Sequence, residues 1–200
     1  MKLVVLVALA LTPAALAAQY RITHTFAVGG EGSWDYVVPD PANHRLFIGR
    51  QTRVMVVDET DGRLLGEVAD IHGAHGTAIA EKTGHGFATS GNDSSIVMFD
   101  LKTFKVLARA HAAEDADAII FDPASNRVFS FNGDAHSSTV VDPASGKLVT
   151  NIALGGKPEY GAEKYARSFS VYAGQGVEKI REILSEGEIV QRLLRRDQRV

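Results

Sequence analysis

The stretch Val54-Met55-Val56-Val57-Asp58 is followed by a short turn, a basic residue and a second apolar segment that begins at Leu64. The same order of residue types returns in Ile96–Asp100 and in Thr139–Asp142, so the aspartates that close the stretches are each 42 residues apart. A fixed period of this length, in which short apolar segments alternate with turns, indicates a repeat architecture built from small sheets.

Each repeat contains four segments with the apolar character of short strands, separated by turn-forming residues such as Pro39–Asn43. The repeats cover residues 29–70, 71–112 and 113–154. Four-stranded units that recur in this way are typical of the blades of a β-propeller. We therefore predict an all-β fold, in which residues 19–160 form about three four-stranded antiparallel blades of an incomplete ring.

The repeat pattern stops before a ring could close, since closed propellers have roughly 4–8 blades. A fourth copy begins at Gly155-Gly156, but the position that should carry its aspartate is Leu184. Apolar residues between positions 176 and 195 recur at helical spacing instead, which predicts an amphipathic helix within a divergent tail, residues 161–200. An open arc of blades exposes strand edges, and three explanations remain open: a C-terminally truncated or frameshifted chain, a chain that self-associates through these edges, or a short variant that the helix caps.

The N-terminal segment has the pattern of a secretory signal peptide. Met1-Lys2 precedes an apolar run, Leu3–Leu11, that is too short to span a bilayer, and Ala15-Leu16-Ala17 supplies the small residues of a cleavage site. We therefore expect residues 1–18 to be removed and the mature chain, without a membrane span, to be periplasmic or secreted. After this segment, Tyr20–Val28 alternates between apolar and polar residues, which predicts a strand.

Composition excludes several classes of function. The net charge is −3 at pH 7, whereas proteins that bind nucleic acids usually carry a basic patch or stripe, so nucleic acid is not an expected partner. The chain has no cysteine, which excludes disulfides and thiolate chemistry. The sequence also contains no nucleophile elbow, P-loop or dinucleotide-binding loop. We therefore predict that the chain is not an enzyme.

Three segments of the third repeat resemble the YVTN-type repeat family of exported β-propellers. They are the turn Asp122–Arg127, the strand end Phe131–Gly133 and the hairpin Val140–Leu148. The resemblance extends over about residues 20–160, although the letters Tyr-Val-Thr-Asn do not occur. It implies an exported propeller of the WD40-like and quinoprotein-dehydrogenase-like superfamily that lacks the C-terminal part of the ring. It leaves the activity open, because propellers host many functions.

Candidate functional residues emerge when the repeats are aligned on their shared aspartates. His75 and Asp117 each precede the aspartate of their repeat by 25 residues, and Asp35 precedes its own by 23 because the first repeat has a shorter hairpin. Glu159 follows Asp117 by one period. Since the first strand of each blade lines the central channel of a propeller, we expect these four side chains to gather at one rim of that channel. Trp34 lies beside them in sequence and is expected either to stack on a ligand or to anchor the core.

The residue types at this rim suit positively charged partners. Carboxylates and an imidazole are ligands for divalent cations and also attract organic cations, so the four residues Asp35, His75, Asp117 and Glu159 are candidate metal ligands as well as ligand-binding residues. The cofactor is otherwise unknown. These features favour a non-catalytic domain that binds a ligand or protein partner of unknown identity at the channel rim. Two alternatives remain, namely a metal-dependent hydrolase or lactonase and a non-functional remnant of a longer propeller.

Overall fold

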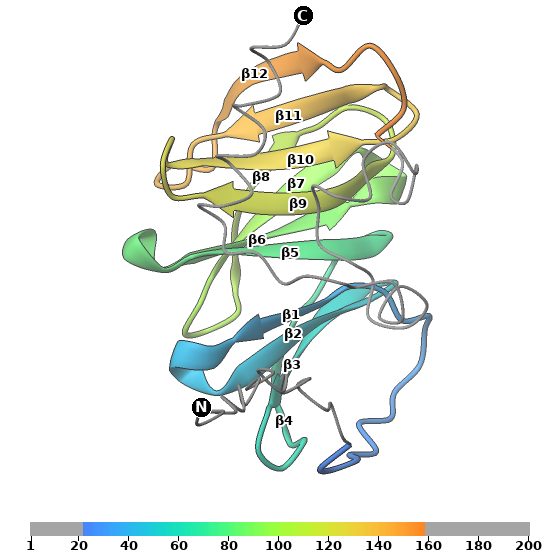
Figure 1. The fold of residues 1–200 in the computed structure, drawn as a ribbon, viewed down its shortest axis with the longest axis vertical. Helices are drawn as coiled ribbons and strands as arrows, with labels where there is room; N and C mark the ends of the chain where they lie inside the picture. Colours follow the sequence, from blue (N-terminus) through green and yellow to red (C-terminus); the bar gives the residue numbers. More distant parts are fainter. Residues whose placement is uncertain (1–21, 159–200) are drawn as a thin grey trace, which may run out of the picture.

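The computed structural model describes residues 22–158, which form three four-stranded antiparallel sheets (Figure 1). In each sheet the order of strands in space follows their order in the chain, and each sheet falls within one 42-residue repeat. The first sheet contains β1 (Val37–Asp40), β2 (Arg45–Arg50), β3 (Arg53–Asp58) and β4 (Leu64–Val68). The second contains β5 (Ala74–Ala80), β6 (His85–Ser90), β7 (Ser95–Asp100) and β8 (Val106–His111). The third contains β9 (Ala116–Asp122), β10 (Arg127–Asn132), β11 (Ser137–Val141) and β12 (Leu148–Ala153).

The sheets lie one after another in chain order, as the adjacent blades of a propeller do (Figure 1). The first strand of the second sheet, β5, contacts the first strands of both neighbours, β1 and β9. The predicted all-β fold with three four-stranded blades is therefore confirmed. The predicted signal peptide and the predicted helix between positions 176 and 195 lie outside the described residues. Within residues 22–158, no helix is long and apolar enough to cross a membrane.

Two apolar clusters pack the sheets against each other. Phe47 and Phe99 belong to the cluster between the first and second sheets, and Phe87 and Val128 belong to the cluster between the second and third. All four side chains are fully buried. Burial of a side chain of this size stabilises the fold by about 1.5–3 kcal/mol. The apolar faces therefore account for how neighbouring blades are held together.

The aspartates that mark the repeat hold the turn that follows the third strand of each blade. The side chain of Asp58 accepts hydrogen bonds from the amide and the hydroxyl of Thr60, and Asp100 and Asp142 accept from backbone amides two and three residues ahead. These bonds lower the pKa of each carboxyl group, for Asp58 chiefly through the Thr60 hydroxyl and for the other two chiefly through the amide three residues ahead. The aspartates that recur every 42 residues in the sequence therefore mark the same turn in each blade.

The prediction of a strand over Tyr20–Val28 is wrong for the residues that the structure describes. Residues 22–30 have no regular secondary structure and are mostly exposed. Alternating side chains suit a strand, but a strand also needs a hydrogen-bonded neighbour, and the described sheets pair only with their own four strands. Instead, Phe26 packs on the turn at Gly62, and Val28 packs on the buried cluster that contains Met55.

Candidate functional site

Three of the predicted rim residues lie together, although they come from three different blades. Asp35 precedes β1, His75 lies near the start of β5 and Asp117 lies near the start of β9. The His75 Nδ1 atom is 2.7 Å from Asp35 Oδ2, which is a hydrogen bond in which the imidazole donates, and 3.9 Å from Asp117 Oδ1. Glu159, the fourth predicted residue, lies outside the described residues. We call Asp35, His75 and Asp117 the rim site.

Local features of the second blade place the His75 ring in this position. The pairing of β5 with β6 shifts between Ala74 and Thr77, so the start of β5 departs from a regular ladder at His75. The hydroxyl of Thr89 donates to the backbone carbonyl of Asp117 at 2.6 Å, which ties β6 to the start of β9. Gly91 leaves room for the imidazole, because a Cβ atom there would lie 2.9 Å from His75 Nε2. The bond from Thr89 therefore joins the second blade to the third, and the other two features set the position of His75 within the second blade.

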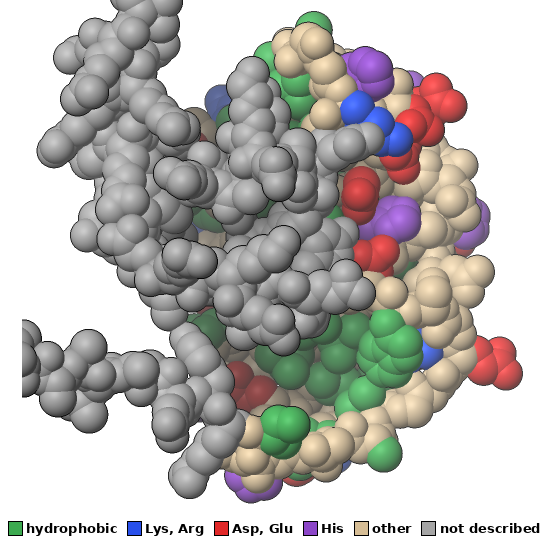
Figure 2. All heavy atoms as spheres, turned by 45° about the vertical axis from the view of Figure 1, so that its right-hand side comes forward, with side chains coloured by type: hydrophobic (Ala, Val, Ile, Leu, Met, Phe, Trp, Pro, Cys, Tyr) green, Lys and Arg blue, Asp and Glu red, His purple; other side chains and the backbone are tan. Residues whose placement is uncertain are grey.

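The rim site contains more negative than positive groups. The pKa of His75 is raised, chiefly by its hydrogen bond to Asp35 and against the opposing effect of burial, with Asp117, Asp35 and Asp115 adding electrostatic attraction. The pKa of Asp117 is also raised, chiefly because burial disfavours its charged form; His75 and Lys157 oppose this shift, and Asp35 and Asp115 add to it. Three carboxyl groups therefore act on one imidazole. Figure 2 shows acidic and histidine side chains beside one another on one face of the molecule.

Trp34 is half-exposed at 52%, so the expectation that it anchors the core is wrong. One face of its indole ring lies against the guanidinium of Arg50, whose Cζ atom is 3.6 Å from the ring centroid. Stacking of this kind is a cation–π contact, and it holds the ring next to Asp35. The structure therefore places Trp34 at the surface, beside the first residue of the rim site.

Arg50 is a structural residue that the sequence reasoning missed. It is fully buried, and its guanidinium donates hydrogen bonds to five backbone carbonyls, those of Gly29, Gly30, Glu31, Gly32 and Ser33. These bonds fold the segment that leads to Trp34 and Asp35 onto the first blade. A signal was present, because the second strand of every repeat ends on a buried polar residue, here Arg50 and in the other blades Ser90 and Asn132.

Among residues 22–158, no group of three or more histidine, aspartate or glutamate side chains has the geometry to hold a metal ion. In the rim site, His75 Nδ1 instead hydrogen-bonds to Asp35 at 2.7 Å. The metal-binding role that we considered for Asp35, His75 and Asp117 therefore has no support in the described residues. The same role for Glu159 lies outside them.

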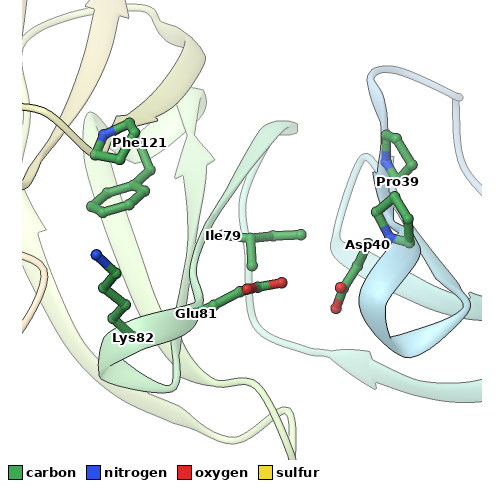
Figure 3. Close-up of a pocket in the computed structure, with 8 residues that line it drawn as sticks. Pro39, Asp40, Ile79, Glu81, Lys82 and Phe121 are labelled. Atoms are coloured by element: carbon green, nitrogen blue, oxygen red, sulfur yellow. The ribbon is translucent and has the colours of Figure 1, made fainter.

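A hollow lies at the ends of the first strands β1, β5 and β9 that are opposite to the rim site. Each blade lines it, since Pro39 and Asp40 come from the end of β1, Ile79 and Lys82 lie at the end of β5, and Phe121 is near the end of β9. Figure 3 shows Phe121 and Lys82 on one side of the hollow and Pro39 and Asp40 on the other. The hollow has a volume of about 300 Å³ and a mostly apolar lining. Of the residues predicted for the rim, the four that the structure describes, Trp34, Asp35, His75 and Asp117, do not line it.

Comparison with known proteins supports the fold. No protein-family model matches the sequence, and no curated protein matches it. Among solved structures, the fold is similar to that of the Kuenenia stuttgartiensis hydrazine synthase, with a TM-score of 0.57 and 16% identity over 66% of this chain and 39% of that chain. It is also similar to U3-55K, with a TM-score of 0.56 and 15% identity over 62% of this chain and 40% of that chain.

Both of these structures are β-propeller proteins, and the chain spans about two fifths of the length of each. At such low identity the likeness concerns the fold and carries no activity or ligand from one protein to another. The described residues form a β-propeller fragment of three adjacent blades.

Proposed function

We propose that this chain is an exported, non-catalytic β-propeller domain whose rim site binds an organic cation, such as the ammonium or guanidinium group of a ligand or protein partner. The observation that carries the proposal is the arrangement of charges in the site: the carboxyl groups of Asp35 and Asp117 lie 2.7 Å and 3.9 Å from the imidazole of His75, and Asp115 also acts on it electrostatically. Lys157 also acts on Asp117, but it is paired with Asp134 at 2.7 Å, so an added cation would still balance an excess of carboxylates.

Asp117 is the group in the site that is best able to meet such a cation. Its side chain is 43% exposed, and its Oδ1 atom lies 3.9 Å from His75 Nδ1, beyond hydrogen-bond distance. Asp35 already accepts a hydrogen bond from His75, at a distance of 2.7 Å. Carboxylates form their strongest hydrogen bonds with ammonium and guanidinium donors, so a ligand of this class gains most by approaching Asp117. Trp34 offers an aromatic surface close to Asp35.

Trp34 is the only tryptophan of the chain, so its fluorescence reports on this region. We expect titration with N-butylguanidinium to produce a saturable change in Trp34 emission. Replacement of Asp117 by Asn removes one charged acceptor, a loss of about 1.5–3 kcal/mol for hydrogen bonds to charged groups, which corresponds to roughly tenfold weaker binding or more. Addition of salt should weaken binding in the wild type, because the attraction is partly between exposed charges.

A matched control distinguishes the site from the general negative charge of the chain. Glu81→Gln removes a carboxylate at the opposite end of β5, where Glu81 lines the hollow, and should leave the affinity for N-butylguanidinium unchanged. A response that does not saturate would refute the proposal. An equal loss of affinity in Asp117→Asn and Glu81→Gln would refute it as well, since binding would then not be located at the rim.

Export and membership of the YVTN-type family belong to the same proposal. They are supported by the basic and apolar pattern of residues 1–18 and by the segments Asp122–Arg127 and Val140–Leu148. A metal-dependent hydrolase or lactonase would need the rim carboxylates and His75 to converge on one ion, and no observation in the described residues favours this. A non-functional remnant would show no saturable binding in the titration above.

A further inference from the structure

The third sheet lies at one end of the row of blades (Figure 1), and its outer face carries apolar side chains. We use this name for the face that carries Ile120, Phe129, Val140 and Ile152 and points away from the second sheet. Ile120, Phe129 and Val140 are successive partners across β9, β10 and β11, and Ile152 lies on β12 opposite Ser138, two residues from Val140. In the middle of the face Val140 is buried, whereas Ile120 and Ile152 at its sides are 44% and 43% exposed.

The repeat shows that this face is the one that a following element should cover. Val68, Ala110 and Ile152 each lie ten residues after the aspartate of their repeat. Val68 is 0% exposed and Ala110 is 7% exposed, because in each case the next sheet covers them, whereas Ile152 is 43% exposed. In the same way Phe47 and Phe87 are fully buried, and their equivalent Phe129 is only partly buried.

A second copy of the chain is a poor fit for this face. In a ring built from two copies, the third sheet of one copy would dock against the free face of the first sheet of the other. That face carries Ile48, Met55 and Val57, which are 5%, 3% and 2% exposed, and Val28 packs against them. Docking there would require the segment that contains Val28 to be displaced. The two end faces are therefore not equivalent, and a covering element from the same chain fits better.

The chain itself supplies a segment of suitable size and chemistry next to this face. The described residues end at position 158, shortly after β12, and Lys157 pairs with Asp134 of the third sheet at 2.7 Å, so the chain leaves from this sheet. A further 42 residues follow, the length of one repeat. Within them, apolar residues recur at helical spacing, namely Val177, Ile180, Ile183, Leu184, Val190, Leu193 and Leu194.

We propose that residues 177–194 dock on the outer face of the third sheet through these apolar side chains and take the place of a fourth blade. A helix of this length would be about 27 Å long, which is more than enough to cross a four-stranded sheet that is about 14 Å wide from first to last strand. Docking buries the sides of the face at Ile120 and Ile152. It also covers the apolar surface at this end of the described blades, which would otherwise promote association.

The absence of cysteine from the chain allows a direct test by cross-linking. The double variant Ile152→Cys/Ile183→Cys places one thiol on the outer face and one in the docking segment, and a short bis-maleimide reports whether they are close. A matched control, Lys102→Cys/Ile183→Cys, places the first thiol in an exposed turn of the second blade instead. The full-length chain is used in both cases, at low protein concentration.

We expect the Ile152 variant to give a cross-linked species of monomer mass whose joined peptides contain positions 152 and 183, and to do so at least tenfold faster than the Lys102 control. Equal rates in the two variants would overturn the proposal, because the segment would then have no preferred position. A product of dimer mass would also overturn it, since the face would then be covered by a second copy.

Discussion

The hydrogen bond between His75 and Asp35 joins the second blade to the first, and Asp35→Asn tests what it contributes. The substitution keeps the shape of the side chain but removes its charge. A hydrogen bond to a charged group contributes about 1.5–3 kcal/mol when it is well shielded from water. Here the His75 and Asp35 side chains are 30% and 26% exposed, so solvent screening reduces the expected loss of stability to about 1 kcal/mol. For a chain of this size, that loss corresponds to a fall in Tm of about 2–4 °C.

The loss should depend on pH in a defined direction. The pKa of His75 lies above its ordinary value of 6.5 in the folded state, chiefly because of this bond, so the folded chain holds the proton more tightly than the unfolded chain. The stabilisation is therefore complete below pH 6.5 and is lost as the pH rises through the raised pKa. The Tm difference between the wild type and Asp35→Asn should be largest at the acidic end of the range and should shrink as the solution becomes alkaline.

Thermal unfolding followed by circular dichroism from about pH 5.5 to 8.5 measures this dependence across the range in which histidine titrates. Asp61→Asn serves as the control, because it removes an equal charge from an exposed turn of the first blade. Its Tm should follow that of the wild type at every pH. A Tm difference for Asp35→Asn that stays constant or grows with pH would refute the link between the bond and the raised pKa.

Three further substitutions test other parts of the structure. Arg50→Met removes the donors that hold residues 29–33, so Trp34 emission should shift to longer wavelength and proteolysis within that segment should accelerate; no change in either would contradict the assigned role. Gly91→Ala places a methyl group 2.9 Å from His75 Nε2, so the NMR titration midpoint of His75 should move, whereas an unchanged midpoint would show that the ring is not confined. Phe87→Ala empties a fully buried position and should cost about 3–5 kcal/mol in urea unfolding; a loss below about 1 kcal/mol would argue against tight packing between the blades.

The blades and most of the rim could be predicted from the sequence because a propeller blade is local. Each strand pairs with the next one in the chain, so a period in the sequence is also a period in space. Alignment on Asp58, Asp100 and Asp142 therefore placed Asp35, His75 and Asp117 in equivalent positions, and the structure brings these three together. Alignment on these aspartates works because each one holds the same turn after the third strand of its blade, so they occupy equivalent positions in space.

The features that the sequence did not reveal depend on contacts between distant segments. Arg50 lies 18–21 residues from the carbonyls of Gly29–Gly32 that it binds, and no local pattern specifies that pairing. A lack of local information also explains the wrong prediction at Tyr20–Val28. The side chains there alternate as in a strand, but no partner strand lies beside them in the described residues. Trp34 was expected to anchor the core or contact a ligand, whereas its ring covers the guanidinium that holds this segment.

The central claim is that three blades bring Asp35, His75 and Asp117 into one acidic site. An NMR titration of the His75 ring in the wild type, in Asp117→Asn and in Asp35→Asn tests it most directly. We predict a wild-type midpoint above 6.5, a lower midpoint in Asp117→Asn and a still lower one in Asp35→Asn, because the bond to Asp35 is the largest cause of the raised pKa. A wild-type midpoint at or below 6.5, or a midpoint that neither substitution changes, would contradict the claim.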